Sequence, residues 1–217
     1  MRSKLLPISG ALAKIAKTGR RILFVATKKQ ASAKIAELAI ETGQYYVNHR
    51  WLGGMLTNWT TITKSIKKMK ELEVLKSNPN NEFTKKEILK ISNQHEKLVK
   101  SLSGISEMKK SPDLLFIIDT KLEHIAVSEA NHLNIPIIGI VDTNCDPDLI
   151  NYPIPGNDDS RRSIDLYCNL IRETINSSNN EINFQESNKI DQPEIREDNV
   201  SSEMNENSNN KNEQNGS

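Results

Sequence analysis

Four continuous apolar segments constrain the fold of this 217-residue chain more than any other feature. They span residues 22–26 (ILFVA), 45–47 (YYV), 114–118 (LLFII) and 135–141 (IPIIGIV). Because apolar residues in these segments do not alternate with polar ones, they predict strands that are buried on both faces, as in a parallel sheet. Helical patterns follow at residues 30–42, 123–134 and 161–174. This order of elements predicts an α/β fold with a doubly wound parallel sheet.

Residues 60–110 interrupt this alternation with two helical patterns. Apolar residues recur every three or four positions as far as Leu75, and residues 77–81 have the composition of a turn. The segment 84–87 (TKKE) is a capping box that opens the second helix. The apolar residues of that helix alternate spacings of three and four, with His95 in one core position and Gly104 placed to end the helix. The pattern predicts an inserted, antiparallel coiled-coil hairpin.

These patterns divide the chain into three parts. We expect the sheet domain in residues 1–59 and 111–175, with the basic helical hairpin inserted at 60–110. Residues 176–217 are rich in Asn, Ser and Glu and contain few apolar residues, so they predict a disordered acidic tail. Residues 5–18 form an amphipathic, acid-free pattern that favours a helix packed on the sheet, with an organelle presequence as the alternative.

Positive charge is concentrated outside the tail. The chain has a net charge of +1, but residues 176–217 contain nine acidic and three basic residues. The hairpin contains twelve lysines against six glutamates. This excess favours contact with a polyanion, with a solvated helical face as the alternative. No run of 18 apolar residues predicts a membrane span, and the two cysteines indicate a reducing compartment.

The segment from Val47 to Trp59 (VNHRWLGGMLTNW) contains both tryptophans of the chain. Arg50 can pair with phosphate and Trp51 can stack on a base, whereas packing of the Trp rings in the core is the alternative. Lysines and arginines also follow the predicted strands and line the hairpin. The predicted RNA-binding residues are Lys28, Lys29, Arg50, Trp51, Lys64, Lys67, Lys68, Lys85, Lys86, Arg161 and Arg162.

The sequence gives little support to catalysis. It contains neither a GxGxxG nor a GxxxxGK[ST] motif, and its four histidines do not have metal-ligand spacing. The best enzymatic feature is a set of acidic residues near strand ends, namely Asp119, Asp142, Asp146, Asp148, Asp158 and Asp159. They could hold Mg²⁺ for phosphoryl chemistry, but turn and helix-cap chemistry is the favoured interpretation. We therefore predict no catalytic residue, no metal site and no cofactor.

Several of these segments, in unbroken order over residues 5–175, resemble the bacterial-type small-subunit ribosomal protein S2 family. The most specific are HRWLGGMLTNW (49–59), VDTNCDPD (141–148) and IPGNDD (154–159). The resemblance implies a flavodoxin-like parallel sheet with an inserted coiled-coil hairpin. It also implies a structural, non-enzymatic component of the small ribosomal subunit. The implied partners are small-subunit rRNA, neighbouring ribosomal proteins and, in bacteria, the mRNA-binding protein S1, with no membrane partner.

The chain also departs from the family pattern. The family usually has about fifty further N-terminal residues, and the resemblance therefore implies that the first strand of the sheet is missing here. We expect residues 22–26 to lie at or near a sheet edge with an unpaired row of backbone groups. The expected location is the ribosome of a bacterial cytoplasm, with an organellar ribosome as the alternative.

Overall fold

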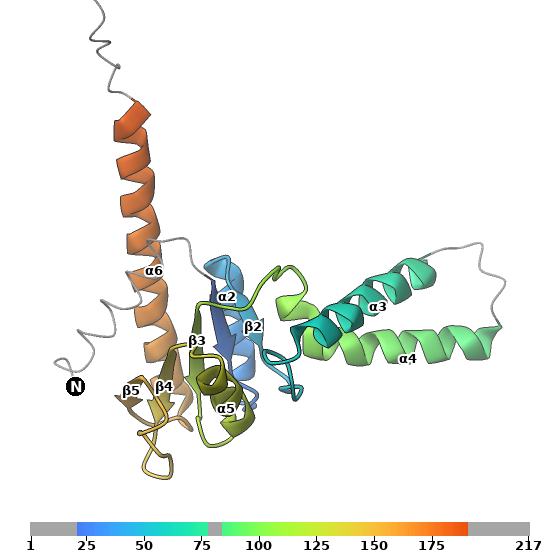
Figure 1. The fold of residues 1–217 in the computed structure, drawn as a ribbon, viewed down its shortest axis with the longest axis horizontal. Helices are drawn as coiled ribbons and strands as arrows, with labels where there is room; N and C mark the ends of the chain where they lie inside the picture. The colour runs from blue at the N-terminus through green and yellow to red at the C-terminus, as the bar shows by residue number, and fades with distance from the viewer. Residues whose placement is uncertain (1–20, 78–83, 191–217) are drawn as a thin grey trace, which may run out of the picture. The chain divides into compact units, whose positions relative to one another are not determined.

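The computed structural model describes residues 21–77 and 84–190. Its core is a five-stranded, all-parallel sheet with the strand order β2-β1-β3-β4-β5 (Figure 1). The strands are β1 (Ile22–Val25), β2 (Tyr45–Val47), β3 (Leu114–Ile118), β4 (Ile137–Val141) and β5 (Tyr152–Pro155). The four predicted strands and the α/β class are confirmed, and the order is that of a flavodoxin-like sheet.

Strand β5 was missed because two of its four residues are prolines. Pro153 and Pro155 have no backbone N–H and therefore indicate a loop in a sequence pattern. In the structure β5 pairs with β4 alone, in the register Ile138↔Tyr152 to Val141↔Pro155. An edge strand tolerates proline because one row of its backbone groups needs no partner strand.

Successive residues of β1 face opposite sides of the sheet, and both sides are covered. Leu23 and Val25 pack in a cluster with α5 (His124–His132) and the segment after β2. Ile22 and Phe24 pack in a second cluster with α2 (Ser32–Glu41) and α6 (Arg161–Ile190). All four β1 residues are fully buried, as the absence of alternation predicts.

The expectation of an unpaired backbone row on β1 is wrong. Strand β1 lies between β2 and β3 and pairs with both of them in parallel. The edge strand is β2, and the short 3₁₀ turn η1 (Ser103–Ile105) packs beside it. A Cβ atom on Gly104 would lie 2.1 Å from the Tyr46 carbonyl oxygen, so only glycine permits this approach. Gly104, expected only to end a helix, therefore brings the end of the hairpin against the edge of the sheet.

The inserted segment forms α3 (Trp59–Ser77) and α4 (Lys85–Leu102), which lie side by side and run in opposite directions (Figure 1). The capping box is confirmed, since the Thr84 hydroxyl accepts from Glu87 N and the Glu87 carboxylate accepts from Thr84 N. Near the sheet, Leu102 and Ile105 are buried, but Ile88 at the opposite end of α4 is 46% exposed. A coiled coil along the whole hairpin stays a prediction.

Helix α6 continues to Ile190, so the domain boundary predicted at residue 175 falls inside a helix. Ile171, Ile175 and Ser178 are buried at helical spacing, and this buried face extends the helix beyond residue 174. The disorder predicted for residues 176–190 is therefore wrong. The predicted helix at 5–18, most of the turn at 77–81 and the tail at 191–217 lie outside the described residues. Within the described residues, no helix combines the length and apolarity that crossing a membrane requires.

Candidate nucleic-acid interface

The segment that joins β2 to α3 is organised around one carboxylate, that of Glu129 on α5. Glu129 Oε1 accepts hydrogen bonds from Trp51 Nε1 (3.0 Å) and Gly54 N (2.8 Å). Its Oε2 accepts from Leu56 N (2.9 Å), Thr57 N (3.1 Å) and the Thr57 hydroxyl (3.2 Å). Because these donors come from one short loop and converge on one side chain, Glu129 determines the path of the loop.

Glu129 is charged in this environment although it is only 8% exposed. Burial alone would raise the pKa of its carboxyl. The hydrogen bonds from the Trp51 side chain and from the backbone of Leu56, Thr57 and Gly54 outweigh that effect, so the pKa is lowered. An ionised carboxylate that accepts several hydrogen bonds holds the loop in one conformation near neutral pH.

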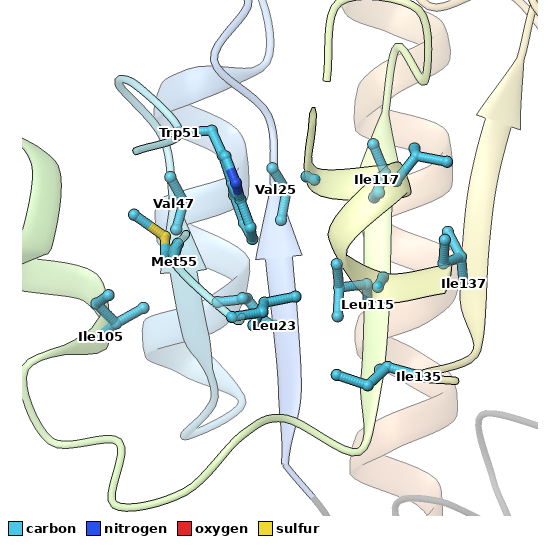
Figure 2. Close-up of a cluster of buried hydrophobic side chains, with 14 of the residues drawn as sticks. Leu23, Val25, Val47, Trp51, Met55, Ile105, Leu115, Ile117, Ile135 and Ile137 are labelled. Carbon is cyan, nitrogen blue, oxygen red and sulfur yellow. The ribbon is translucent and has the colours of Figure 1, made fainter. Parts of the chain in front are cut away.

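Trp51 belongs to the hydrophobic core. Its ring is 6% exposed and packs with Val25, Val47 and Met55 on one face of the sheet (Figure 2). Its indole N–H is committed to Glu129. A ring held in this way has no face free to stack on a base, so we correct the prediction that Trp51 contacts RNA. Core packing, the alternative left open by the sequence, is what the structure shows.

Arg50 and His49 lie in the same loop, but both are exposed. The backbone on either side of them is anchored. The Ser32 hydroxyl donates to the Asn48 carbonyl (2.7 Å), and the Asn48 amide donates to the Ser32 carbonyl (3.3 Å). Trp51 fixes the other side. The loop therefore presents the Arg50 guanidinium to solvent from a well-defined backbone position.

The predicted lysines of the hairpin are exposed on the side away from its buried residues. On α3 the buried positions are Ile62, Ile66, Met69 and Leu72. The exposed lysines Lys64, Lys67 and Lys68 fall between them at helical spacing, and they form one basic face. Lys85 and Lys86 are exposed in the first turn of α4.

Lys28 differs from the other predicted RNA-binding residues. Its side chain is 17% exposed, and its ammonium pairs with the carboxylates of Asp119 (3.1 Å), Asp158 (3.0 Å) and Asp159. Burial alone would lower the pKa of Lys28, but the three carboxylates outweigh it and raise the pKa. An ammonium surrounded by three acids has no net positive charge to offer a phosphate. The structure therefore does not support the predicted RNA contact of Lys28.

The contacts of Lys28 also locate the remaining predicted residues. They bring the segment before α6 beside the end of β1, so that Lys29, Arg161 and Arg162 lie at the same edge of the sheet. All three are exposed. Across residues 21–77 and 84–190, no ion pair involves Lys29, Arg50, Lys64, Lys67, Lys68, Lys85, Lys86, Arg161 or Arg162.

The acidic strand-end residues divide into two groups. Asp146 Oδ1 accepts from Asp148 N (3.0 Å), which is turn chemistry, as the favoured interpretation has it. The side chain that caps the turn before α6 is Asn157, whose Oδ1 accepts from Asp159 N and Ser160 N at 2.8 Å. Asp158 has no such role, and its side chain points to Lys28 instead.

Sequence reasoning missed Glu129, although a signal for it exists. Glu129 lies three positions after Ala126 and one before Ala130, both of which are fully buried on α5. A glutamate on the buried face of a short helix requires several partners, because an unpaired buried charge is very costly. The sequence shows that requirement, but it does not show that the partners are in the segment 51–57.

Comparison with known proteins agrees with this arrangement. The model of the family described as Ribosomal protein S2 matches residues 5–178. The chain belongs to the ribosomal protein S2 family. Among curated S2 relatives, the small ribosomal subunit protein uS2 of Ehrlichia canis is 59% identical over 155 residues, which is 71% of this chain and 53% of that protein. The uS2 protein of Rhizobium rhizogenes is 56% identical over 153 residues, 70% of this chain and 60% of that protein.

The match to S2 relatives is bacterial and partial. The uS2 protein of Anaplasma phagocytophilum is 56% identical over 155 residues, 71% of this chain and 52% of that protein. The chain therefore spans about half the length of the curated relatives that it matches. The shared region contains the loop around Glu129, the hairpin and the edge of the sheet with Lys29 and Arg161.

Proposed function

We propose that this chain is a structural component of the small ribosomal subunit that binds small-subunit rRNA and neighbouring ribosomal proteins. The observation that carries the proposal is the basic surface of nine exposed Lys and Arg side chains without ion pairs among the described residues. It is defined by Lys29, Arg50, Lys64, Lys67, Lys68, Lys85, Lys86, Arg161 and Arg162. Membership of the S2 family, whose bacterial relatives are named small ribosomal subunit proteins, supports it.

The proposed binding is electrostatic and depends on shape. Ammonium and guanidinium groups that have no protein partner can neutralise phosphates and release counterions, which favours binding at low salt. The basic face of α3 is rigid because the opposite face of the helix is packed. Arg50 is rigid because Glu129 and Ser32 anchor its loop. Such a surface recognises the backbone geometry of folded RNA and requires no catalytic group.

The partners and location follow from the same proposal. We place the chain on the ribosome in a bacterial cytoplasm, where the mRNA-binding protein S1 is one of the neighbouring proteins with which it associates. An organellar ribosome is the second location to test. Co-sedimentation of the full chain with ribosomal particles from a bacterial lysate tests this proposal most directly. A chain that stays in the supernatant at low salt would contradict it.

A salt titration tests the electrostatic mechanism. Binding of the full chain to small-subunit rRNA should weaken steeply as salt rises. Combined substitution of Lys64, Lys67 and Lys68 by Gln should reduce the slope of log affinity against log salt by about 2–3, since each lysine neutralises about one phosphate. The matched control is Lys34→Gln, because Lys34 is paired with Glu37 (2.9 Å). Equal slopes for the triple variant and the wild type would remove α3 from the interface.

A further inference from the structure

Asp158 has an unsatisfied carboxylate oxygen in a buried position. The residue is 2% exposed, and its Oδ1 accepts from Lys28 Nζ at 3.0 Å. Its Oδ2 is buried, and the described part of the chain provides no hydrogen-bond partner for it. Most buried carboxylate oxygens in proteins have a partner, so this atom requires an explanation.

Lys28 cannot be that partner. An ammonium group has three protons to donate, and Lys28 Nζ already pairs with Asp119, Asp158 Oδ1 and Asp159. It has no further proton for Asp158 Oδ2. The local charge is also unbalanced, because Asp142 brings a fourth carboxylate to a cluster that contains a single ammonium. A second positive charge would remove both deficits.

The geometry suits a cation bound by oxygen. One carboxylate oxygen from each of Asp142, Asp158 and Asp159 lies within 4.8 Å of the other two. Two oxygens that bind the same Ca²⁺ at about 2.3–2.6 Å are at most about 5 Å apart, and Mg²⁺ requires about 4 Å. The three oxygens therefore fit Ca²⁺ as they stand and Mg²⁺ after a small contraction.

The position in the sheet is also that of a ligand site. Asp119 follows β3 and Lys28 follows β1, and in the order β2-β1-β3-β4-β5 the chain reverses direction between β1 and β3. Ligands of open α/β sheets bind beyond the carboxyl ends of the strands at such a switch point. We propose that Asp142, Asp158 and Asp159 bind a hard divalent cation at this edge of the sheet. The site does not depend on the proposed ribosomal function, and it corrects the expectation that the chain binds no metal.

Metal titration of the full chain tests the proposal. Mn²⁺, followed by electron paramagnetic resonance, should bind with a stoichiometry of one and be displaced by Mg²⁺ or Ca²⁺. Asp142→Asn should weaken Mn²⁺ binding by about tenfold or more, because it removes one charged ligand. Asp142 is the first choice because Lys28 does not pair with it, so the variant keeps the Lys28 ion pairs. Asp159→Asn, at a side chain that is 69% exposed, is the second variant.

Asp148→Asn is the matched control, because Asp148 is an exposed acid in a nearby loop and its backbone takes part in a turn. It should bind Mn²⁺ as the wild type does. Equal losses in Asp148→Asn and Asp142→Asn would show diffuse attraction to acidic side chains and overturn the proposal.

Two other results would also overturn it. Asp158 Oδ2 can be satisfied by protonation, and burial raises the pKa of this carboxyl in that direction. In that case Mg²⁺ and Ca²⁺ would leave the melting temperature unchanged at constant ionic strength. A second set of ligand atoms, from Asp119, Cys145 and Asp158, suits a softer metal. Zn²⁺ binding that is lost in Cys145→Ser and kept in Asp142→Asn would assign the site to that set.

Discussion

The lysine at the edge of the sheet and the lysines of the hairpin have the same chemistry but opposite surroundings. Lys28 is largely buried and is paired with three carboxylates. Lys64, Lys67 and Lys68 are exposed and have no ion pair among the described residues. The sequence predicts an RNA contact for all four. The comparison shows that a basic side chain can serve a polyanion only where the fold leaves its charge uncompensated.

The loop between β2 and α3 repeats this contrast within adjacent residues. Trp51 is buried and donates to Glu129, whereas Arg50 is exposed. Trp51→Ala should lower the free energy of unfolding by about 3–5 kcal/mol, because it leaves a cavity and removes a donor from Glu129. Arg50→Ala should change it by less than about 0.5 kcal/mol. Chemical denaturation of both variants measures the difference. A large loss in Arg50→Ala would show that its guanidinium has a structural partner.

The junction of hairpin and sheet should be nearly as sensitive. Gly104→Ala places a methyl group 2.1 Å from the Tyr46 carbonyl oxygen, so the end of the hairpin must move off the edge of the sheet. We expect a loss of about 3 kcal/mol in thermal or chemical unfolding. Gly53→Ala is the control, because no atom lies within 4 Å of its added Cβ. Equal stability of the two variants would mean that η1 is not held against β2.

Glu129 links the loop to the sheet and adds a dependence on pH. Glu129→Gln should cost about 2 kcal/mol at pH 7, since an amide cannot accept from all the donors of the loop. The folded-state pKa of Glu129 is lowered, so its contribution is present above the unfolded pKa of about 4.3 and is lost as pH falls through the folded value. The wild type should therefore lose stability below about pH 4.3 more steeply than the variant does. Parallel acid titrations of the two proteins would contradict this account of the loop.

A matched pair of lysine substitutions tests the first comparison at the smallest expected effect. Lys28→Met leaves three carboxylates without their cation and should destabilise the fold by about 1–2 kcal/mol, because the ion pairs are only partly buried. Lys67→Met should leave stability within about 0.5 kcal/mol and weaken binding to rRNA. Thermal melts and filter binding separate the two effects. If Lys28→Met weakens RNA binding without loss of stability, the contrast between the two regions fails.

Much of the fold could be predicted from local patterns. The continuous apolar segments identify β1, β2, β3 and β4, and the capping box identifies the start of α4. The bounds of β2 and β3 match the predicted ones because polar residues and turn formers flank these segments closely. Strand β5 and the second half of α6 were missed, since prolines hide the first and Asn and Ser dilute the apolar spacing of the second. Patterns of burial within one element identify that element, but they do not identify its neighbours.

What the sequence alone determined is therefore the α/β class, the inserted hairpin, the family and the set of basic residues. Each of these depends on residue type and on spacing along the chain. Only the tertiary structure decided which charges are compensated. Lys28 meets acids that lie 91 and 130 residues away, and Trp51 meets a glutamate 78 residues away. Coulomb energy and hydrogen bonding fall off over a few ångströms, so these outcomes depend on distances in space that the order of residues does not contain.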